Sequence, residues 1–171
     1  MKVFKFGGAS VKDAAGVRNV ADLLKSVGYE NTCMIVSAMG KTTNALEEVV
    51  KRYFENEDFE KTISEVKEQH IALATELFDN PVEVSNEISQ FFDDIVSFLR
   101  RNKSPNYSYV YDQIVCCGEL ISTKIISMYL NSIHVNNDWL DVRDYIKTDN
   151  TYREGKVNWK LTEDSISKLP K

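Results

Sequence analysis

The chain has 171 residues, of which 43% are hydrophobic, and a formal net charge of −5 at pH 7. This composition indicates a globular domain with a core, and the lack of a basic stripe argues against a nucleic-acid partner. No apolar run approaches the length of a membrane span. Three irregularly spaced cysteines (Cys33, Cys116 and Cys117) predict reduced thiols in a cytoplasmic protein. The two histidines lie far apart in the sequence, so we expect no metal site built from protein ligands.

The N-terminus predicts a strand, a glycine turn and a helix in direct succession. Residues 2–6 are apolar except for Lys5; Gly7 and Gly8 follow at once, and Ser10 opens a helical pattern. Such a layout aims backbone N–H groups and a helix dipole at an anion, and a nearby lysine suits phosphate oxygens. The alternative is an ordinary turn with a solvated lysine, because glycine is the default turn residue.

A second strand follows the first helix. Apolar residues recur at helical spacing from Val11 to Ser26, and Gly28 predicts a left-handed residue past the helix end. Thr32–Val36 is a short apolar run typical of a strand buried on both faces. Strand, helix and strand together predict a βαβ unit with parallel pairing.

The middle and end of the chain are mostly helical in pattern. Two long apolar stripes joined at a proline turn predict an antiparallel helical hairpin over about residues 58–103. Further on, we expect two helical halves separated by Gly118 and then a strand over residues 134–140. Thr162 is the predicted N-cap of a last short helix.

The loop after the second strand allows two interpretations. Residues 40–42, Gly-Lys-Thr, suggest a phosphate-binding P-loop, but its first glycine would have to fall at Ile35, inside the strand. Alternatively, the hydroxyl residues Ser37, Thr42 and Thr43 stand at the carboxyl end of a strand, where open α/β sheets bind ligands. A cap on the following helix is the purely structural role for either threonine.

Glu119 stands at the N-terminal edge of an otherwise apolar helix. A carboxylate at this place complements the helix dipole. In a binding site, the same carboxylate can hold a substrate ammonium group through a charge-assisted hydrogen bond.

Taken together, several short blocks resemble the aspartokinases of the amino acid kinase family. These blocks follow the family's order and extend to about Asp149. Ala9 departs from the pattern, because the family usually has threonine there. The blocks are Lys5–Val11, Val36–Met39 with Thr43–Asn44, Gly118–Leu120 with Ser122–Thr123, and Leu140–Asp144 with Thr148–Asp149.

The resemblance implies transfer of the γ-phosphoryl group of ATP to the side-chain carboxylate of L-aspartate, with Mg²⁺ held mainly by the nucleotide and no metal ligand from the protein. Lys5 would be catalytic, against the transferring group. The residues implied to bind the ATP phosphates are Lys5, Phe6, Gly7, Gly8 and Ser10. Those implied to bind or line the aspartate site are Ser37, Ala38, Thr43 and Glu119.

The resemblance also implies that residues 1–171 are the N-terminal portion of a longer catalytic domain. The expected fold class is α/β, a three-layer α/β/α domain with a mainly parallel sheet, incomplete here, plus the inserted hairpin. The nucleotide-binding half and the regulatory ACT domains, through which the parent would form a homodimer, would be absent, and the fragment alone inactive. The parent would open lysine, threonine and methionine biosynthesis. The alternatives are a P-loop NTPase using residues 40–42 and a non-catalytic ligand-binding module.

Overall fold

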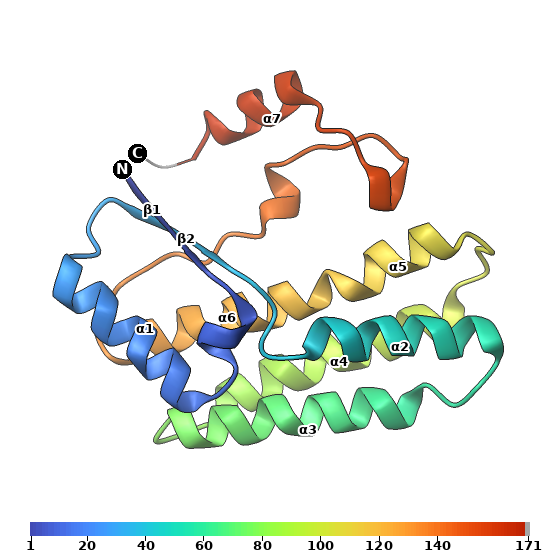
Figure 1. The fold of residues 1–171 in the computed structure, drawn as a ribbon, viewed down its shortest axis with the longest axis horizontal. Helices are drawn as coiled ribbons and strands as arrows, with labels where there is room; N and C mark the ends of the chain where they lie inside the picture. The colour runs from blue at the N-terminus through green and yellow to red at the C-terminus, as the bar shows by residue number, and fades with distance from the viewer. Residues whose placement is uncertain (170–171) are drawn as a thin grey trace.

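The computed structural model describes residues 1–169. A strand–helix–strand unit opens the chain, and a packed set of long helices follows it (Figure 1). In chain order the elements are β1 (Lys2–Phe6), the 3-10 helix η1 (Gly8–Val11), α1 (Ala14–Val27), β2 (Thr32–Val36), α2 (Thr42–Glu55), α3 (Glu60–Leu77), α4 (Val82–Arg101), α5 (Tyr107–Val115), α6 (Cys117–Ser132), the short 3-10 helices η2 (Val142–Asp144) and η3 (Tyr152–Glu154), and α7 (Trp159–Ile166).

The sheet is a parallel pair. β1 and β2 align with Lys2 opposite Thr32 and Phe6 opposite Val36, and α1 makes the crossover between them. The predicted βαβ unit is therefore confirmed. Among residues 1–169 the sheet contains only these two strands.

The helices cover one face of this sheet. Phe6 and Val36 are 9% and 7% exposed, whereas Val3 and Ile35, which point to the opposite face, are 62% and 50% exposed. The prediction that the second strand is buried on both faces is therefore wrong for the described residues. Nothing in them covers the second face.

The first helix begins later than the sequence predicts. Ser10 lies inside η1, and α1 starts only after Asp13, whose carboxylate accepts a hydrogen bond from the Gly16 N–H at 2.8 Å. Aspartate is a strong N-cap because it satisfies a backbone donor of the first turn. At the other end, Gly28 has the expected positive φ of 76°, although its ψ of 129° lies outside the αL region.

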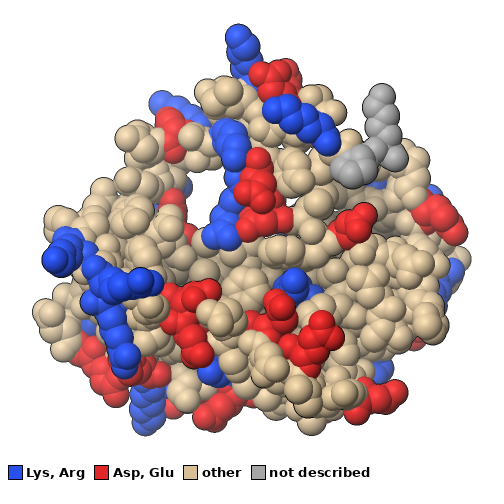
Figure 2. Space-filling model, turned by 180° about the vertical axis from the view of Figure 1, so that it is seen from behind, with Lys and Arg blue, Asp and Glu red and all other residues tan. Residues whose placement is uncertain are grey.

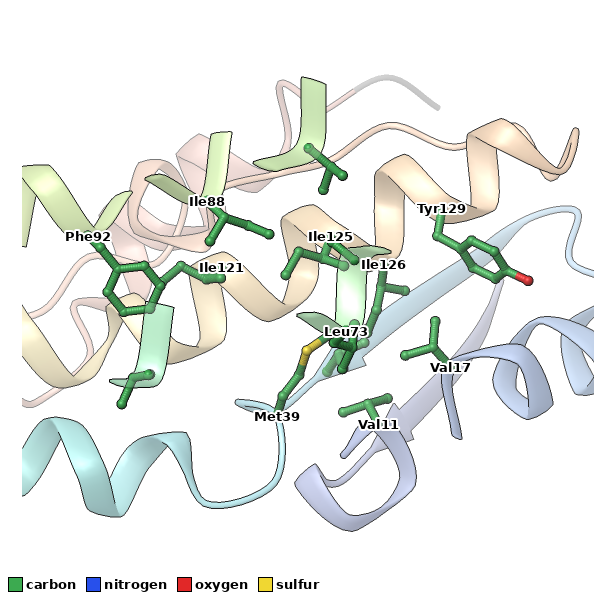
Figure 3. Packing of buried hydrophobic residues seen from close by; sticks show 14 of the residues in the cluster. Val11, Val17, Met39, Leu73, Ile88, Phe92, Ile121, Ile125, Ile126 and Tyr129 are labelled. Atoms are coloured by element: carbon green, nitrogen blue, oxygen red, sulfur yellow. The ribbon is translucent and has the colours of Figure 1, made fainter. Parts of the chain in front are cut away.

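The helices after β2 pack into a bundle. α3 and α4 lie against each other as the predicted hairpin, α2 packs on α3 and α5, and α4 packs on α6. Figure 3 shows Phe92 of α4, which is fully buried, beside Ile121 of α6. Met39 extends from the loop after β2 toward Leu73 of α3 in the same core (Figure 3). The hairpin therefore shares a core with the loop that follows the sheet.

α5 and α6 form an almost continuous helical segment. The break falls at Cys116, and Gly118 lies in the first turn of α6 rather than between two halves, as predicted. The segment Tyr107–Ser132 is long and apolar enough to cross a membrane by length and composition alone. However, 61% of its most apolar window is buried inside the protein, as in the core helix of a globular domain.

The predicted strand over residues 134–140 is irregular in the structure. Asn137 explains part of the difference. Its backbone N–H donates to the Asn131 side chain at 2.9 Å, and its side-chain amide donates to the Ser127 carbonyl at 3.2 Å. These bonds tie the segment to the last turns of α6, so a local asparagine takes the place of a strand ladder.

The last helix is capped by Asn158 and not by Thr162. The Asn158 side chain accepts from the Leu161 N–H at 3.2 Å. Thr162 lies inside α7, buried, and its hydroxyl oxygen accepts from the Lys147 N–H at 3.0 Å. The threonine therefore anchors the helix to the preceding loop.

Charged residues of both signs are mixed on the surface. Figure 2 shows Lys and Arg side chains interspersed with Asp and Glu side chains on the face that it draws. Two exposed ion pairs, Arg100–Glu60 at 2.8 Å and Lys67–Asp93 at 3.1 Å, connect α4 with α3. Exposed pairs of this kind contribute about 0–1 kcal/mol each, so the hairpin depends mainly on its apolar core.

Candidate functional site

The loops after the two strands are hydrogen-bonded to each other. The Ser37 N–H donates to the Phe6 carbonyl at 3.0 Å, and the Gly40 N–H donates to the Gly8 carbonyl at 3.1 Å. Because the strands are parallel, both loops leave the same edge of the sheet. The residues predicted around Gly8 and those predicted around Ser37 are thus neighbours.

The two glycines of the first loop have different surroundings. A Cβ on Gly8 would lie 2.6 Å from the Ala38 carbonyl oxygen and 3.2 Å from the Gly40 carbonyl oxygen. Gly8 therefore permits a close approach of two backbones that a larger residue would prevent. A Cβ on Gly7 would meet no atom within 4 Å, so its backbone borders open space on that side.

The N-terminus of α6 is attached to the second loop. Glu119 stands in the first turn of α6, and its Oε1 accepts a hydrogen bond from the Ala38 N–H at 3.3 Å. Ser122, fully buried, donates through its hydroxyl to the Ser37 carbonyl at 2.8 Å. Gly118 packs so closely that a Cβ there would lie 3.0 Å from the Ala38 Cβ. The structure therefore brings Ser37, Ala38 and Glu119 together.

Ser122 belongs to the block that resembles aspartokinases, but its part in the site was not predicted from the sequence. The available signal was a single hydroxyl among apolar residues of a buried helix. A buried hydroxyl needs a hydrogen-bond partner, and here that partner is the loop that carries Ser37.

Lys5 lies at the same end of the sheet on the uncovered face. It pairs in register with Ile35 and is exposed. Ala38, which binds Glu119, follows Ile35 by three residues. Lys5 and Glu119 are therefore attached to the same edge of the sheet, Lys5 through its register with Ile35 and Glu119 through its bond to Ala38.

Ser10 is placed differently from its predicted role. It belongs to η1, and its N–H donates to the Gly7 carbonyl at 2.9 Å within that turn. Its backbone donor is therefore already bonded, and α1 begins beyond it. The exposed hydroxyl of Ser10 is the group that a ligand at this loop can meet.

The first turn of α2 is fixed by buried hydrogen bonds of the Thr42 hydroxyl. Thr43 lies in its first turn, half-buried, and the preceding Thr42 is buried with its hydroxyl donating to the Met39 carbonyl at 2.7 Å. His70 of α3 places its Nε2 3.3 Å from the Thr42 hydroxyl, and its Nδ1 lies 2.8 Å from the Val66 carbonyl. Burial lowers the pKa of His70 below its ordinary value, so its ring is neutral at pH 7.

This arrangement argues against the P-loop interpretation. In a P-loop the threonine after the lysine directs its hydroxyl to a nucleotide-bound Mg²⁺. Thr42 is only 6% exposed and its hydroxyl points inward, toward Met39 and His70. No group of three potential metal ligands gathers among residues 1–169.

Known proteins share this sequence in part. Residues 1–170 match the model of the amino acid kinase family. Aspartokinase 1, chloroplastic, of Arabidopsis thaliana is 33% identical over 153 residues, which are 86% of this chain and 26% of that protein. Bifunctional aspartokinase/homoserine dehydrogenase 2 of Escherichia coli (strain K12) is 26% identical over 151 residues, 86% of this chain and 18% of that protein. The chain thus spans about a quarter or less of the length of these relatives.

Solved structures share the fold. E. coli aspartokinase III in complex with aspartate and ADP superposes with a TM-score of 0.82 at 22% identity, over 98% of this chain and 37% of that chain. Clostridium acetobutylicum aspartate kinase superposes with a TM-score of 0.74 at 20% identity, over 99% of this chain and 36% of that chain. The expected incomplete α/β fold is therefore confirmed. With its family match extending over 170 of its 171 residues, this chain belongs to the amino acid kinase family.

Proposed function

We propose that the whole protein is an ATP-dependent aspartate kinase, which transfers the γ-phosphoryl group of ATP to the side-chain carboxylate of L-aspartate. The product is 4-phospho-L-aspartate, the first intermediate toward lysine, threonine and methionine. One observation carries this proposal: the loop after β1, the loop after β2 and the N-terminus of α6 are held together by hydrogen bonds at one edge of the sheet. The similarity to proteins named aspartokinases supports the choice of substrate.

The nucleotide side of the site comprises Lys5 and the glycine loop. Gly7 presents its backbone to open space, which is where a phosphate group can approach closely. The exposed Lys5 supplies a positive charge to the transferring phosphoryl group, and Phe6, Gly8 and the Ser10 hydroxyl complete this wall. ATP, accompanied by the Mg²⁺ that it carries, supplies the phosphoryl group when bound.

The aspartate side of the site comprises Thr43 and Glu119. A carboxylate accepts several hydrogen bonds, so Glu119 can bind the Ala38 N–H and a substrate ammonium group together. Ser37 and Ala38 form the wall between substrate and nucleotide. The substrate carboxylate is already a nucleophile, so no general base is needed, and positioning and charge neutralisation drive the reaction.

The proposal concerns the whole protein rather than these residues alone. We expect no appreciable ATP turnover from residues 1–171, and a homodimer in the complete enzyme. Three free cysteines suit a reducing compartment, and we propose the cytoplasm. The plant relatives named above are chloroplastic.

Three variants of the whole enzyme test the proposal. Lys5→Met removes the charge at the phosphoryl group and should lower kcat by ~100-fold or more. Glu119→Gln keeps an oxygen for the Ala38 N–H but removes the negative charge, so it should raise the KM for aspartate more than the KM for ATP. Lys41→Ala, at the neighbouring loop, is the matched control and should leave kcat within about twofold.

Each alternative has its own outcome in this experiment. A P-loop NTPase would lose activity in Lys41→Ala and keep it in Lys5→Met. A binding module would bind aspartate, as measured by calorimetry, with no ATP turnover even in the wild type. Either result would refute the proposed kinase.

A further inference from the structure

The loop after β2 contains a tight turn from Met39 to Thr42. The Met39 carbonyl oxygen accepts two hydrogen bonds from Thr42, one from the backbone N–H at 3.0 Å and one from the hydroxyl at 2.7 Å. Gly40, inside the turn, has a positive φ of 53°, which glycine adopts readily. Because the hydroxyl and the backbone of Thr42 bond the same carbonyl, the side chain stabilises this one conformation of the turn.

This turn lies between the residues of the proposed aspartate site. Ser37 and Ala38 come directly before it, and Thr43 follows it. The end before the turn is fixed to α6, because the Ala38 N–H donates to Glu119 at 3.3 Å and the Ser37 carbonyl accepts from Ser122 at 2.8 Å. The position of Thr43 relative to Glu119 therefore depends on the geometry of the turn.

His70 of α3 supports the turn from the core side. Its Nε2 lies 3.3 Å from the Thr42 hydroxyl oxygen, and its ring packs against Phe92 of α4 with the ring centroids 5.7 Å apart. His70 is 3% exposed and Thr42 is 6% exposed, so bulk water does not compete for this contact. Through His70, the helical hairpin thus meets the loop that carries Ala38 and Thr43.

The Thr42 hydroxyl serves two acceptors with one hydrogen. A carbonyl oxygen only accepts, so the neutral His70 ring carries its hydrogen on Nδ1, 2.8 Å from the Val66 carbonyl oxygen, and Nε2 is an acceptor. The hydroxyl therefore faces the Met39 carbonyl at 2.7 Å and the His70 Nε2 at 3.3 Å. Loss of this hydroxyl would remove a partner from both buried acceptors, which couples Thr42 and His70 energetically.

We propose that Thr42 and His70 are positioning residues for aspartate binding, because they hold the turn that sets Thr43 relative to Glu119. Their polar groups face the core, so they act through the turn and not by contact with the substrate. This inference rests on the proposed aspartate kinase function. It gives the helical hairpin a part in aspartate affinity through His70.

Steady-state kinetics of the whole enzyme test this role. Thr42→Val removes the hydroxyl and keeps the branched shape of the side chain. We expect the KM for aspartate to rise at least about fivefold, and kcat and the KM for ATP to stay within about twofold. Thr42→Ser restores a hydroxyl and should bring the KM for aspartate back to within about twofold of the wild-type value.

Thr162→Val is the matched control for a general loss of stability. Thr162 is also buried, at 3% exposure, and its hydroxyl oxygen accepts from the Lys147 N–H at 3.0 Å. This variant should also lower Tm, but it should leave the KM for aspartate within about twofold. Circular dichroism checks that each variant is folded.

A double-mutant cycle tests whether Thr42 and His70 act together. His70→Leu removes the Nε2 acceptor and should by itself raise the KM for aspartate several-fold. In the His70→Leu background, Thr42→Val should raise that KM by at most about half the factor that it does in the wild type, because one of its two acceptors is already gone.

The outcomes separate this inference from the proposed function. A wild type without aspartate-dependent ATP turnover would refute the kinase, and the positioning role with it. Normal turnover in the wild type, combined with an unchanged KM for aspartate in Thr42→Val, would overturn the positioning role alone. The same holds for an equal rise in Thr162→Val, or for equal factors in the two backgrounds of the cycle.

Discussion

The close approach of Gly8 to the second loop gives the sharpest prediction. In Gly8→Ala the new Cβ would start 2.6 Å from the Ala38 carbonyl oxygen and must retreat about 0.8 Å to reach ordinary contact at 3.4 Å. The Gly40 carbonyl oxygen, 3.2 Å away, restricts movement in the other direction. Overpacking against groups that cannot rotate away costs about 1–3 kcal/mol, and here the obstacles are backbone atoms rather than flexible side chains.

We therefore expect Gly8→Ala to destabilise the chain by about 2 kcal/mol. For a domain of this size, that lowers Tm by about 4–8 °C. Gly7→Ala is the matched control: a Cβ there meets nothing within 4 Å, and Gly7 has an ordinary extended backbone with φ −78° and ψ 166°. This variant should be neutral or stabilising by up to ~1 kcal/mol, because alanine restricts the unfolded chain.

Thermal and urea denaturation of the 171-residue chain, followed by circular dichroism, measure both variants. The prediction concerns the difference between neighbouring glycines, so the general preference of glycine for turns is common to both. If Gly8→Ala were no less stable than Gly7→Ala, the close packing of the two loops would be wrong.

Two further predictions concern the buried polar contacts of the site. Ser122→Ala removes the hydroxyl donor to the Ser37 carbonyl and should cost about 1–3 kcal/mol in urea denaturation; a loss within experimental error would show that this bond does not hold α6 to the loop. The pKa of His70 in the folded state lies below its unfolded value of 6.5. Burial of the neutral ring therefore costs no stability above pH 6.5. As pH falls below 6.5, the unfolded chain takes up a proton more readily than the folded one, and the free energy of unfolding decreases. From about pH 7.5 to about pH 5.5 the wild type should therefore lose more unfolding free energy than His70→Gln. The difference can be at most about 1.4 kcal/mol per pH unit. Equal losses in the two proteins would contradict this role for His70.

Local patterns in the sequence were sufficient for the elements whose boundaries are marked by local chemistry. Apolar periodicity and the turn signal at residues 79–81 predicted the α3–α4 hairpin, and the apolar runs on either side of Gly28 predicted the βαβ unit. In contrast, the strand expected over residues 134–140 does not form, because a strand needs a partner and Asn137 binds the end of α6 instead. The apolar composition of residues 134–140 could not show whether a neighbouring strand was available to pair with them.

The helix starts were also predicted incorrectly, because contacts with residues distant in sequence influence which side chain caps a helix. The sequence pattern placed the first helix start at Ser10 and the last helix cap at Thr162, whereas Asp13 and Asn158 cap these helices in the structure. The choice depends on which side chain is free to bond the first turn. The Thr162 hydroxyl oxygen accepts a hydrogen bond from the N–H of Lys147, 15 residues earlier in the sequence. The side chain of Asn158 therefore caps α7 instead.

Three features could be predicted from the amino-acid sequence alone: the order of strand, glycine turn and helix, the helical hairpin, and the blocks that resemble aspartokinases. These depend on neighbouring residues, whose periodicity and backbone preferences act without the rest of the chain. The fold, in contrast, was needed to show that Glu119 binds the N–H of Ala38, which lies 81 positions earlier in the sequence, and that Thr42 turns its hydroxyl inward. Such contacts join distant segments, and they form only when a shared apolar core has brought those segments together.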